Sequence, residues 1–314
     1  MIRHALALTA GLGTRLRPLT DVRAKPAIPV GGEPMIRRII RTLVAQEIDD
    51  LVLNLHHLPA TLTAVVGDGR DLGARVRYSW EPAILGSAGG PRLARPIVGA
   101  RTFWIVNGDT LTDLSFGALA DRHAASGARV TLALVPNREF ERYGGVHLDT
   151  DGRVTRFTPR GPASAGSYHF IGIQLVDGAV FDGVRAGDVA SSIGGVYDAL
   201  IAGSPGAVRG FVCDAAFFDV GTVDDYRRTD DAFRSAANGG ADPTPSVGRG
   251  TTIDPTARVT RSILWDDVRV GAAATLDECI VTDGVTVPAG AAYARSVLLR
   301  GDDDRPIVAP VSVP

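Results

Sequence analysis

Cysteine, net charge and long apolar runs are all scarce in this sequence, and each scarcity excludes a class of protein. The 314 residues include two cysteines, Cys213 and Cys279, which form neither a disulfide framework nor the close pairs of a zinc site. The formal net charge is −2, so no overall basic field attracts nucleic acid or a membrane surface. A site for anions must therefore be local.

Apolar runs long enough to cross a membrane are missing too. No stretch reaches about 20 apolar residues, and the N-terminal MIRHALALTAGLG has too short an apolar core for a signal peptide. We therefore expect a cytoplasmic protein with neither membrane nor nucleic-acid partners. Apolar residues make up 45% of the chain, which is enough for a sizeable core.

Strand-like and helix-like segments alternate over the first 235 residues. This alternation predicts an α/β fold with a largely parallel sheet, covered by helices and binding its ligand at the carboxyl ends of the strands. Residues 145–157, GVHLDTDGRVTRF, alternate around Asp151-Gly152 and predict a hairpin near the sheet edge. The expected strands are 3–8, 50–55, 75–80, 102–106 and 169–176, and the expected helices are 34–46, 58–66, 116–125 and 222–236.

The C-terminal region repeats with a period of 17 residues. It follows a stretch rich in glycine and proline, residues 237–250, which we interpret as a linker. The rows begin at Ile253, Val270 and Val287, and bulky residues recur every five or six positions in the first two. This pattern predicts a β-solenoid over residues 251–314. Because it has only about three coils, we expect it to pack against the first domain or another subunit for stability. We therefore expect a homo-oligomer.

A small, cationic loop follows the first strand, within LTAGLGTRLRPLTDVRAKP at residues 8–26. Its glycines let backbone N–H groups converge on an anion; Thr14 adds a hydroxyl, Arg15 a guanidinium fork and Lys25 a point charge. The loop lacks the Gly-Lys-Ser/Thr ending of nucleoside-triphosphatases, and Leu16 replaces the third glycine of the dinucleotide fingerprint. The glycines alone are compatible with an ordinary turn, whereas the added Thr-Arg and Lys-Pro favour a phosphate site.

Further motifs follow the run AGLGTRLRPLT…KP in a fixed order. They are PVGGEPMI (29–36), LGSAGG (85–90), VNGD (106–109), YGGV (143–146) and FFDVGTVDDY (217–226). Together they resemble the sugar-1-phosphate nucleotidyltransferases over about residues 1–235, and the repeat resembles the left-handed β-helix that many members append. The resemblance implies a catalytic domain at 1–236 with a Rossmann-like, mainly parallel sheet and helices on both faces (the GT-A-like nucleotidyltransferase fold).

The resemblance also implies a reaction in which a nucleoside triphosphate joins a sugar 1-phosphate and pyrophosphate leaves. The sugar phosphate oxygen attacks the α-phosphorus in line, so the protein mainly positions two anions and neutralises charge. By analogy, Gly11, Gly13 and Thr14 hold the triphosphate, Arg15 offsets charge on the departing pyrophosphate, and Lys25 bridges the reacting phosphates.

Two aspartates, Asp109 and Asp219, are implied ligands of Mg²⁺, with Asp109 also counted as catalytic. Both follow strand-like apolar runs, and a hard cation prefers carboxylate oxygens completed by phosphate oxygens and waters. Taken alone, Asp109 also fits an Asn-Gly-Asp turn and Asp219 fits a helix cap, although Thr222 is better placed for that cap.

The remaining site residues follow from the same resemblance. The expected base and ribose contacts are Leu8, Ala10, Gly11, Gly86 and Gly89, with Glu81 nearby; the expected sugar-phosphate contacts are Gly144, Gly145, Arg160 and His169. Taken alone, LGSAGG is typical of a flexible loop. Many members carry Glu-Lys-Pro after the hairpin, where this chain has Pro159-Arg160-Gly161. Because proline cannot replace a carboxylate, the sugar specificity of other members does not transfer.

Several functions stay open at this point. Guanylyl transfer from GTP to mannose 1-phosphate or a heptose 1-phosphate comes first, and transfer from UTP or dTTP to glucose 1-phosphate follows. A catalytically silent regulatory paralogue that binds a nucleotide-sugar is the alternative from another class. An acyltransferase activity of the solenoid ranks last, because the repeat contains no histidine.

Overall fold

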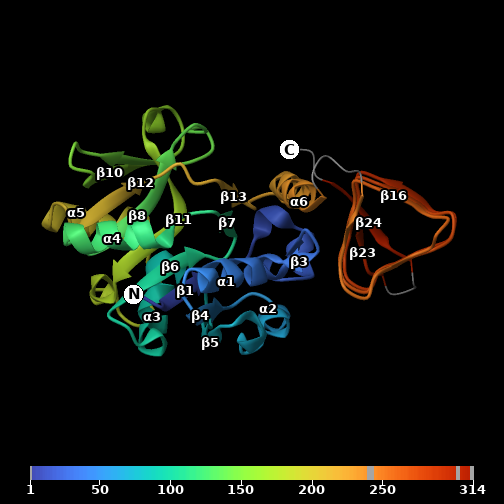
Figure 1. Ribbon diagram of the computed structural model, residues 1–314, viewed down its shortest axis with the longest axis horizontal. Coiled ribbons are helices and arrows are strands. Elements are labelled where there is room, and N and C mark those ends of the chain that lie inside the picture. Colours follow the sequence, from blue (N-terminus) through green and yellow to red (C-terminus); the bar gives the residue numbers. More distant parts are fainter. Residues whose placement is uncertain (1, 239–243, 302–304, 312–314) are drawn as a thin grey trace. The chain divides into compact units, whose positions relative to one another are not determined.

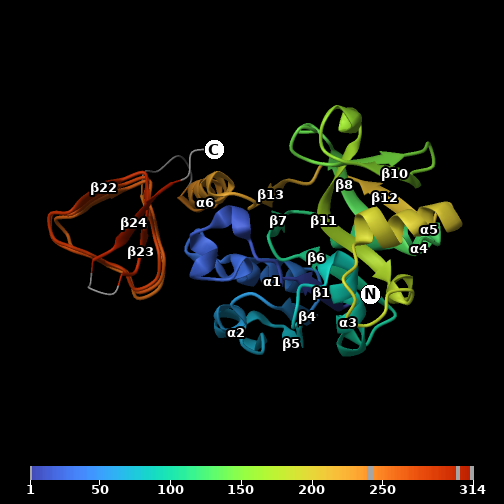
Figure 2. The same ribbon diagram turned by 180° about the vertical axis from the view of Figure 1, so that it is seen from behind.

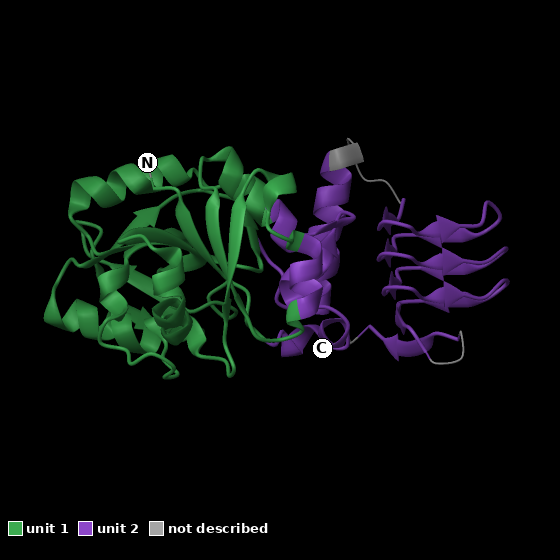
Figure 3. Ribbon diagram, turned by 90° about the horizontal axis from the view of Figure 1, so that it is seen from below, with its two compact units in different colours: residues 1–11, 39–59, 66–217 green, residues 12–38, 60–65, 218–314 purple. Residues whose placement is uncertain are grey.

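The computed structural model describes residues 2–238, 244–301 and 305–311 (Figure 1). The chain forms two compact units, shown in different colours in Figure 3. The first unit contains residues 1–11, 39–59 and 66–217, and the second contains residues 12–38, 60–65 and 218–314. Among the described residues, no helix combines the length and apolarity needed to span a membrane.

The first unit is built on a nine-stranded mixed sheet. Its main path runs β10-β9-β11-β6-β1-β4-β5, and β8 and β12 extend it from β11. The strands β6, β1, β4 and β5 are mutually parallel, which confirms the parallel part of the predicted sheet. The bounds are β1 His4–Leu8, β4 Asp50–Leu55, β5 Arg75–Trp80, β6 Thr102–Asn107, β8 Val130–Pro136, β9 Gly145–Leu148, β10 Val154–Thr158, β11 Tyr168–Asp177 and β12 Val208–Val212.

Helices cover both faces of this sheet, as predicted. Side chains alternate along β6, so Phe103 and Ile105 join the buried cluster that includes residues of α3 and α5. On the opposite face, Trp104 makes an edge contact with Phe116 of α4 at 5.0 Å between ring centroids. The bounds are α1 Met35–Ala45, α2 Pro59–Val66, α3 Gly86–Val98, α4 Phe116–Ser126 and α5 Tyr197–Gly203.

The antiparallel part of the sheet is larger than predicted. The hairpin β9–β10 forms at one edge, which confirms the turn at Asp151-Gly152. However, β11 lies inside the sheet and pairs antiparallel with both β6 and β8, and β12 then adds parallel to β8 (Figures 1 and 2). Sequence analysis missed β8, β12 and α5, whose short apolar runs carry no decisive period.

The second unit contains the β-helix. Strand pairs join residues 17 positions apart: Ile263 pairs with Ile280, which pairs with Val297. This register confirms the repeat, and Figure 3 shows the coils stacked on one another. The bounds are β14 Ser246–Val247, β15 Thr252–Ile253, β16 Arg258–Thr260, β17 Ile263–Leu264, β18 Arg269–Val270, β19 Thr275–Asp277, β20 Ile280–Val281, β21 Thr286–Val287, β22 Ala292–Ala294, β23 Ser296–Leu299 and the antiparallel β24 Ile307–Pro310.

Helix α6 and four short strands complete the list of elements. Helix α6 runs to Asn238, two residues into the predicted linker, and β14 already pairs with β17. The linker is therefore shorter than predicted at both ends, and its residues 239–243 lie outside the described residues. The remaining bounds are β2 Pro29–Val30, β3 Glu33–Pro34, β7 Thr110–Thr112, β13 Phe217–Asp219 and α6 Val223–Asn238.

Candidate active site

A buried hydrogen-bond chain ties together the carboxyl ends of three parallel strands in the first unit. The side chain of Asn54, on β4, accepts a bond from Thr9 N at 2.6 Å and donates to Glu81 Oε1 at 2.6 Å. Glu81 Oε2 in turn accepts from Leu85 N at 2.9 Å, at the start of α3. Because Glu81 is 1% exposed and both its oxygens are used, it organises the site rather than facing a base.

The LGSAGG motif is a helix start and not a loop, which corrects the sequence-based interpretation. Gly86 opens α3 with φ +77°, and a Cβ built there lies 2.6 Å from the carbonyl oxygen of Ala190. A Cβ at Gly89 would overlap the carbonyl oxygen of Asp188. The protein's own backbone therefore explains both glycines, without a ligand.

The end of β1 places four predicted residues near one another. Leu8 is the last residue of β1, and its carbonyl oxygen accepts a bond from Gly108 N at 2.9 Å, so Asp109 follows directly beside this strand end. Asp109 is half-buried, and its Oδ1 lies 3.5 Å from Thr110 Oγ1. Ala10 is buried, whereas Gly11 is exposed and a Cβ built on it meets nothing within 4 Å.

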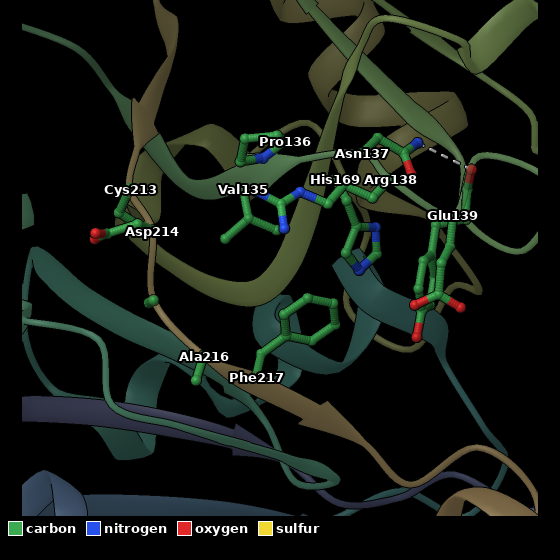
Figure 4. A pocket seen from close by; sticks show the side chains of 12 residues that line it. Val135, Pro136, Asn137, Arg138, Glu139, His169, Cys213, Asp214, Ala216 and Phe217 are labelled. Atoms are coloured by element: carbon green, nitrogen blue, oxygen red, sulfur yellow. Dashed lines mark hydrogen bonds between the residues drawn. The ribbon is translucent and has the colours of Figure 1, made fainter.

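A cavity of about 360 Å³ lies in the same unit (Figure 4). Its floor and walls come from the end of β8, the loop after it, β11 and the segment before β13. Asn137 lines it and is 8% exposed; its Nδ2 donates to Tyr143 O at 3.2 Å. The Oδ1 of Asn137 is buried and has no hydrogen-bond partner among the described residues.

His169 is the sequence-predicted residue that lines this cavity. Its ring stacks on Tyr143 at 4.0 Å between centroids and lies 5.2 Å from the ring of Phe217. Burial lowers the pKa of His169 to about 4, so the imidazole is neutral at pH 7. The three rings form an aromatic cluster on one side of the cavity, and the charged residues Arg138, Glu139 and Asp214 also line it.

The other three predicted sugar-phosphate residues do not line the cavity. Gly145 is buried, and a Cβ there would lie 2.6 Å from Thr158 Oγ1, so packing explains this glycine. Gly144 and Arg160 are exposed, and a Cβ on Gly144 would lie 2.9 Å from Thr158 O. Arg160 follows β10 on an exposed turn, where its guanidinium is accessible to an anion.

The second unit gathers the remaining residues of the glycine loop. Gly13 has φ +62° and precedes the 3₁₀ turn Thr14–Leu16. A Cβ on Gly13 would lie 2.7 Å from Thr20 Cγ2 and 3.3 Å from Lys25 Cβ, so the loop folds closely over the segment that carries Lys25. Thr14 and Arg15 are exposed. The turn therefore carries an exposed hydroxyl and an exposed guanidinium, and Lys25 packs against it through its Cβ.

Arg15 also approaches the segment after β13. A Cβ built on Gly221 lies 3.2 Å from Arg15 Nη2, and Gly221 follows two residues after the half-buried Asp219. Thr222 caps α6, because its Oγ1 accepts from Asp225 N at 3.2 Å while the Asp225 carboxylate accepts from Thr222 N at 3.0 Å. This cap confirms the interpretation of Thr222, so Asp219 is not needed for that role.

Sequence analysis missed Asn54 and Asn137. Asn54 interrupts the apolar run LVLNL, and a polar residue in such a strand is a usable signal for a buried network. Asn137 carries no comparable signal, because its buried position depends on the loop between β8 and β9.

Comparisons with known proteins agree with this architecture. Residues 4–235 match the family described as nucleotidyl transferase, and residues 239–298 match the GlmU-like C-terminal hexapeptide family. The mannose-1-phosphate guanylyltransferase of Mycobacterium tuberculosis is 30% identical over 93% of this chain and 83% of its own length. The D-glycero-alpha-D-manno-heptose 1-phosphate guanylyltransferase of Aneurinibacillus thermoaerophilus is 32% identical over 72% of this chain and 96% of its own.

A solved structure supports the fold independently. HddC from Yersinia pseudotuberculosis superposes with a TM-score of 0.63 at 21% identity, covering 73% of this chain and 98% of its own. The match to the family model spans the whole region in which the motifs, the mixed sheet and the glycine loop occur. The two relatives are, by name, guanylyltransferases for sugar 1-phosphates. The chain is a member of the nucleotidyl transferase family and carries a hexapeptide-type β-helix at its C-terminal side.

Proposed function

We propose that this protein transfers a guanylyl group from GTP to mannose 1-phosphate or a closely related sugar 1-phosphate, and releases pyrophosphate. The observation that carries the proposal is the similarity to a mannose-1-phosphate guanylyltransferase over 93% of the chain, β-helix included. A guanylyltransferase for a manno-heptose 1-phosphate is a second relative, 32% identical over 72% of the chain. Both relatives, by name, use a guanylyl donor and a manno-configured sugar.

The glycine loop supplies what a triphosphate needs. Gly11 leaves open space at its Cα, Gly13 makes the left-handed turn, and Thr14 is exposed and carries a hydroxyl. Arg15 would neutralise the departing pyrophosphate with its guanidinium fork, and Lys25 would bridge the reacting phosphates as a point charge. These charges matter because two anionic reactants repel each other as they approach.

Magnesium is part of the proposal. Asp109 and Asp219 each offer hard carboxylate oxygens and are half-buried, so each retains an accessible surface. Mg²⁺ usually takes one or two carboxylates and completes its shell with waters and substrate phosphates, so each of these aspartates offers suitable ligand atoms. When bound, the ion would offset negative charge on the phosphates during the displacement.

The cavity around His169 is the proposed place for the sugar ring. The aromatic rings of Tyr143, His169 and Phe217 that line this cavity suit the C–H face of a pyranose. Because His169 is neutral at pH 7, it can donate and accept hydrogen bonds without adding charge. Aromatic faces together with hydrogen-bonding groups are typical of a site for a hydroxyl-rich ring.

Pyrophosphate release tests this function. Purified protein is mixed with Mg²⁺, one of the common nucleoside triphosphates and one sugar 1-phosphate, across all pairs. We expect the highest kcat/KM for GTP with mannose 1-phosphate or a manno-heptose 1-phosphate, loss of release with a chelator, and recovery when Mg²⁺ is restored. Asp109→Asn should lower the rate by about 100-fold or more.

The other results decide between the alternatives. A preference for UTP or dTTP with glucose 1-phosphate would replace the guanylyl assignment, as the 29% identical UTP–glucose-1-phosphate uridylyltransferase of Synechocystis sp. would suggest. No release from any pair, with nucleotide-sugar binding still measurable by calorimetry, would identify a regulatory paralogue instead.

A further inference from the structure

Two aspartates occupy equivalent positions on successive coils of the β-helix. Asp266 and Asp283 are 17 residues apart, which is the repeat of the coil, and Asp283 Oδ1 accepts from Asp266 N at 3.1 Å. Two carboxylates stacked in this way repel each other unless a cation lies between them. Within the second unit, Arg23 contacts both carboxylates, whereas Arg249 contacts Asp266 at 3.4 Å. Arg23 belongs to the family-matched region rather than to the β-helix.

Arg23 contacts both carboxylates through a buried guanidinium. Its Nε and Nη2 each lie 2.6 Å from one oxygen of Asp283, and Nη2 lies 2.8 Å from Asp266 Oδ2. The side chain of Arg23 is 8% exposed and lies over the ring of Trp265 at 5.4 Å. Removing one partner of such a buried pair leaves a charge without compensation.

The same contact fixes the backbone around Lys25. Arg23 Nη1 donates to Ala27 O at 3.3 Å, so the guanidinium closes over the turn Lys25–Ala27. Ala24 N donates to Thr61 Oγ1 at 3.0 Å, which holds the residue between Arg23 and Lys25. Lys25 is thus flanked on both sides by anchored backbone.

A second bridge supports the same segment from its far end. Trp265 Nε1 donates to Tyr226 Oη at 3.0 Å, and Tyr226 Oη donates to Pro29 O at 2.7 Å. Both Trp265 and Tyr226 are fully buried. The first two coils of the β-helix therefore hold residues 23–29 at two points, through Arg23 and through Tyr226.

We propose that Arg23 is a positioning residue, through which Asp266 and Asp283 of the β-helix hold Lys25 and the loop packed on it in the geometry needed for nucleotidyl transfer. Because Gly13 packs against Lys25 Cβ and Thr20, a fixed position of Lys25 also fixes the glycine loop. The β-helix then serves the reaction as a scaffold for the phosphate-binding loop, in addition to any role in assembly. This inference rests on the proposed function for the roles of Arg15 and Lys25.

A matched control exists on the same β-helix. Arg227 of α6 pairs with Glu278 at 3.1 Å, and the two side chains are 25% and 28% exposed. This ion pair also joins the β-helix to the rest of the second unit, but the glycine loop and residues 23–29 take no part in it. Glu278 also pairs with Arg261 of the β-helix at 3.3 Å, so its substitution tests the structural value of β-helix ion pairs away from residues 23–29.

The experiment compares Asp283→Asn with Glu278→Gln, both assayed below their own unfolding temperatures. We expect Asp283→Asn to lower kcat for pyrophosphate release about tenfold, because displaced phosphate-binding groups lose alignment, while Glu278→Gln stays within about twofold of the wild type. Arg23→Lys should retain only part of the wild-type kcat, since an ammonium cannot contact both carboxylates as a fork. Equal kcat values for the two carboxamide variants and the wild type would overturn the inference.

Hydrogen exchange gives a second readout that does not depend on turnover. Amides in residues 13–23, where Leu16 N bonds to Gly13 O and Arg23 N to Leu19 O, should exchange about tenfold faster in Asp283→Asn than in Glu278→Gln. If the wild type releases no pyrophosphate with any pair, the proposed function fails, yet this comparison still decides whether Arg23 holds the loop. Equal exchange in both variants would refute the positioning role, even if Arg23→Lys does not fold.

Discussion

Two glycine-rich segments of this protein resemble each other in sequence but differ in what surrounds their glycines. At residues 10–15, a Cβ added to Gly11 would meet nothing within 4 Å. At residues 85–90, a Cβ added to Gly86 would meet the Ala190 carbonyl oxygen at 2.6 Å, and one at Gly89 would overlap that of Asp188. The first glycine leaves space that the protein does not fill, whereas the other two make room for its own backbone.

The difference shows that a glycine motif has two physical explanations that sequence cannot separate. A ligand-binding glycine and a packing glycine both lack a side chain, and both tolerate close approach. Only the neighbouring atoms distinguish them. Substitution with alanine should therefore affect stability at Gly86 and Gly89 and activity at Gly11.

Gly89→Ala should produce the largest effect, a loss of about 3 kcal/mol in the free energy of unfolding. The added methyl would overlap the backbone of Asp188 and lie 2.9 Å from Leu85 Cβ, so α3 or the segment 188–190 must shift. Thermal or urea unfolding measures the change. An unchanged unfolding midpoint together with a raised KM for the triphosphate would instead make Gly89 a ligand contact.

Glu81→Gln should cost about 2 kcal/mol of unfolding free energy and tests the network that positions the second segment. Both carboxylate oxygens accept from N–H donors, one from Asn54 and one from Leu85. In glutamine one oxygen is replaced by NH₂, so one of these two N–H donors would lose its acceptor. Denaturant unfolding gives the loss. Glu141→Gln, at an exposed position, serves as the control and should change stability by less than about 0.5 kcal/mol.

The parts of the fold that could be predicted are those set by local patterns. The strands at Asp50–Leu55 and Arg75–Trp80 and the 17-residue repeat follow from periodicity, and the structure confirms them. Helix α3 was missed because Gly86–Val98 contains two prolines and three glycines, a composition typical of loops. Its conformation depends on residues 188–190, about a hundred positions away.

The candidate site also has a part that could be predicted from the sequence and a part that could not. The glycine loop and the motif order indicated the family, and the family model confirms it. The contact of Arg23 with Asp283 joins residues 260 positions apart, and Asn137 acquires its buried acceptor only when the loop after β8 folds. Such long-range contacts leave no periodic trace in a single sequence.

Gly11→Ala should have the smallest effect in free energy, a fall in kcat/KM for the triphosphate of about tenfold, or about 1.4 kcal/mol. The methyl would occupy space that a phosphate or ribose needs, but it would contact no protein atom within 4 Å, so unfolding should not change measurably. Gly117→Ala is the matched control, since its Cβ also meets open space, on the first turn of α4. That control should leave the kinetics unchanged and raise stability by up to about 1 kcal/mol, because alanine favours a helix. If Gly11→Ala keeps the wild-type kcat/KM, the open space at Gly11 is not a substrate site. The glycines of the first segment would then differ from those of the second in packing only, and not in function.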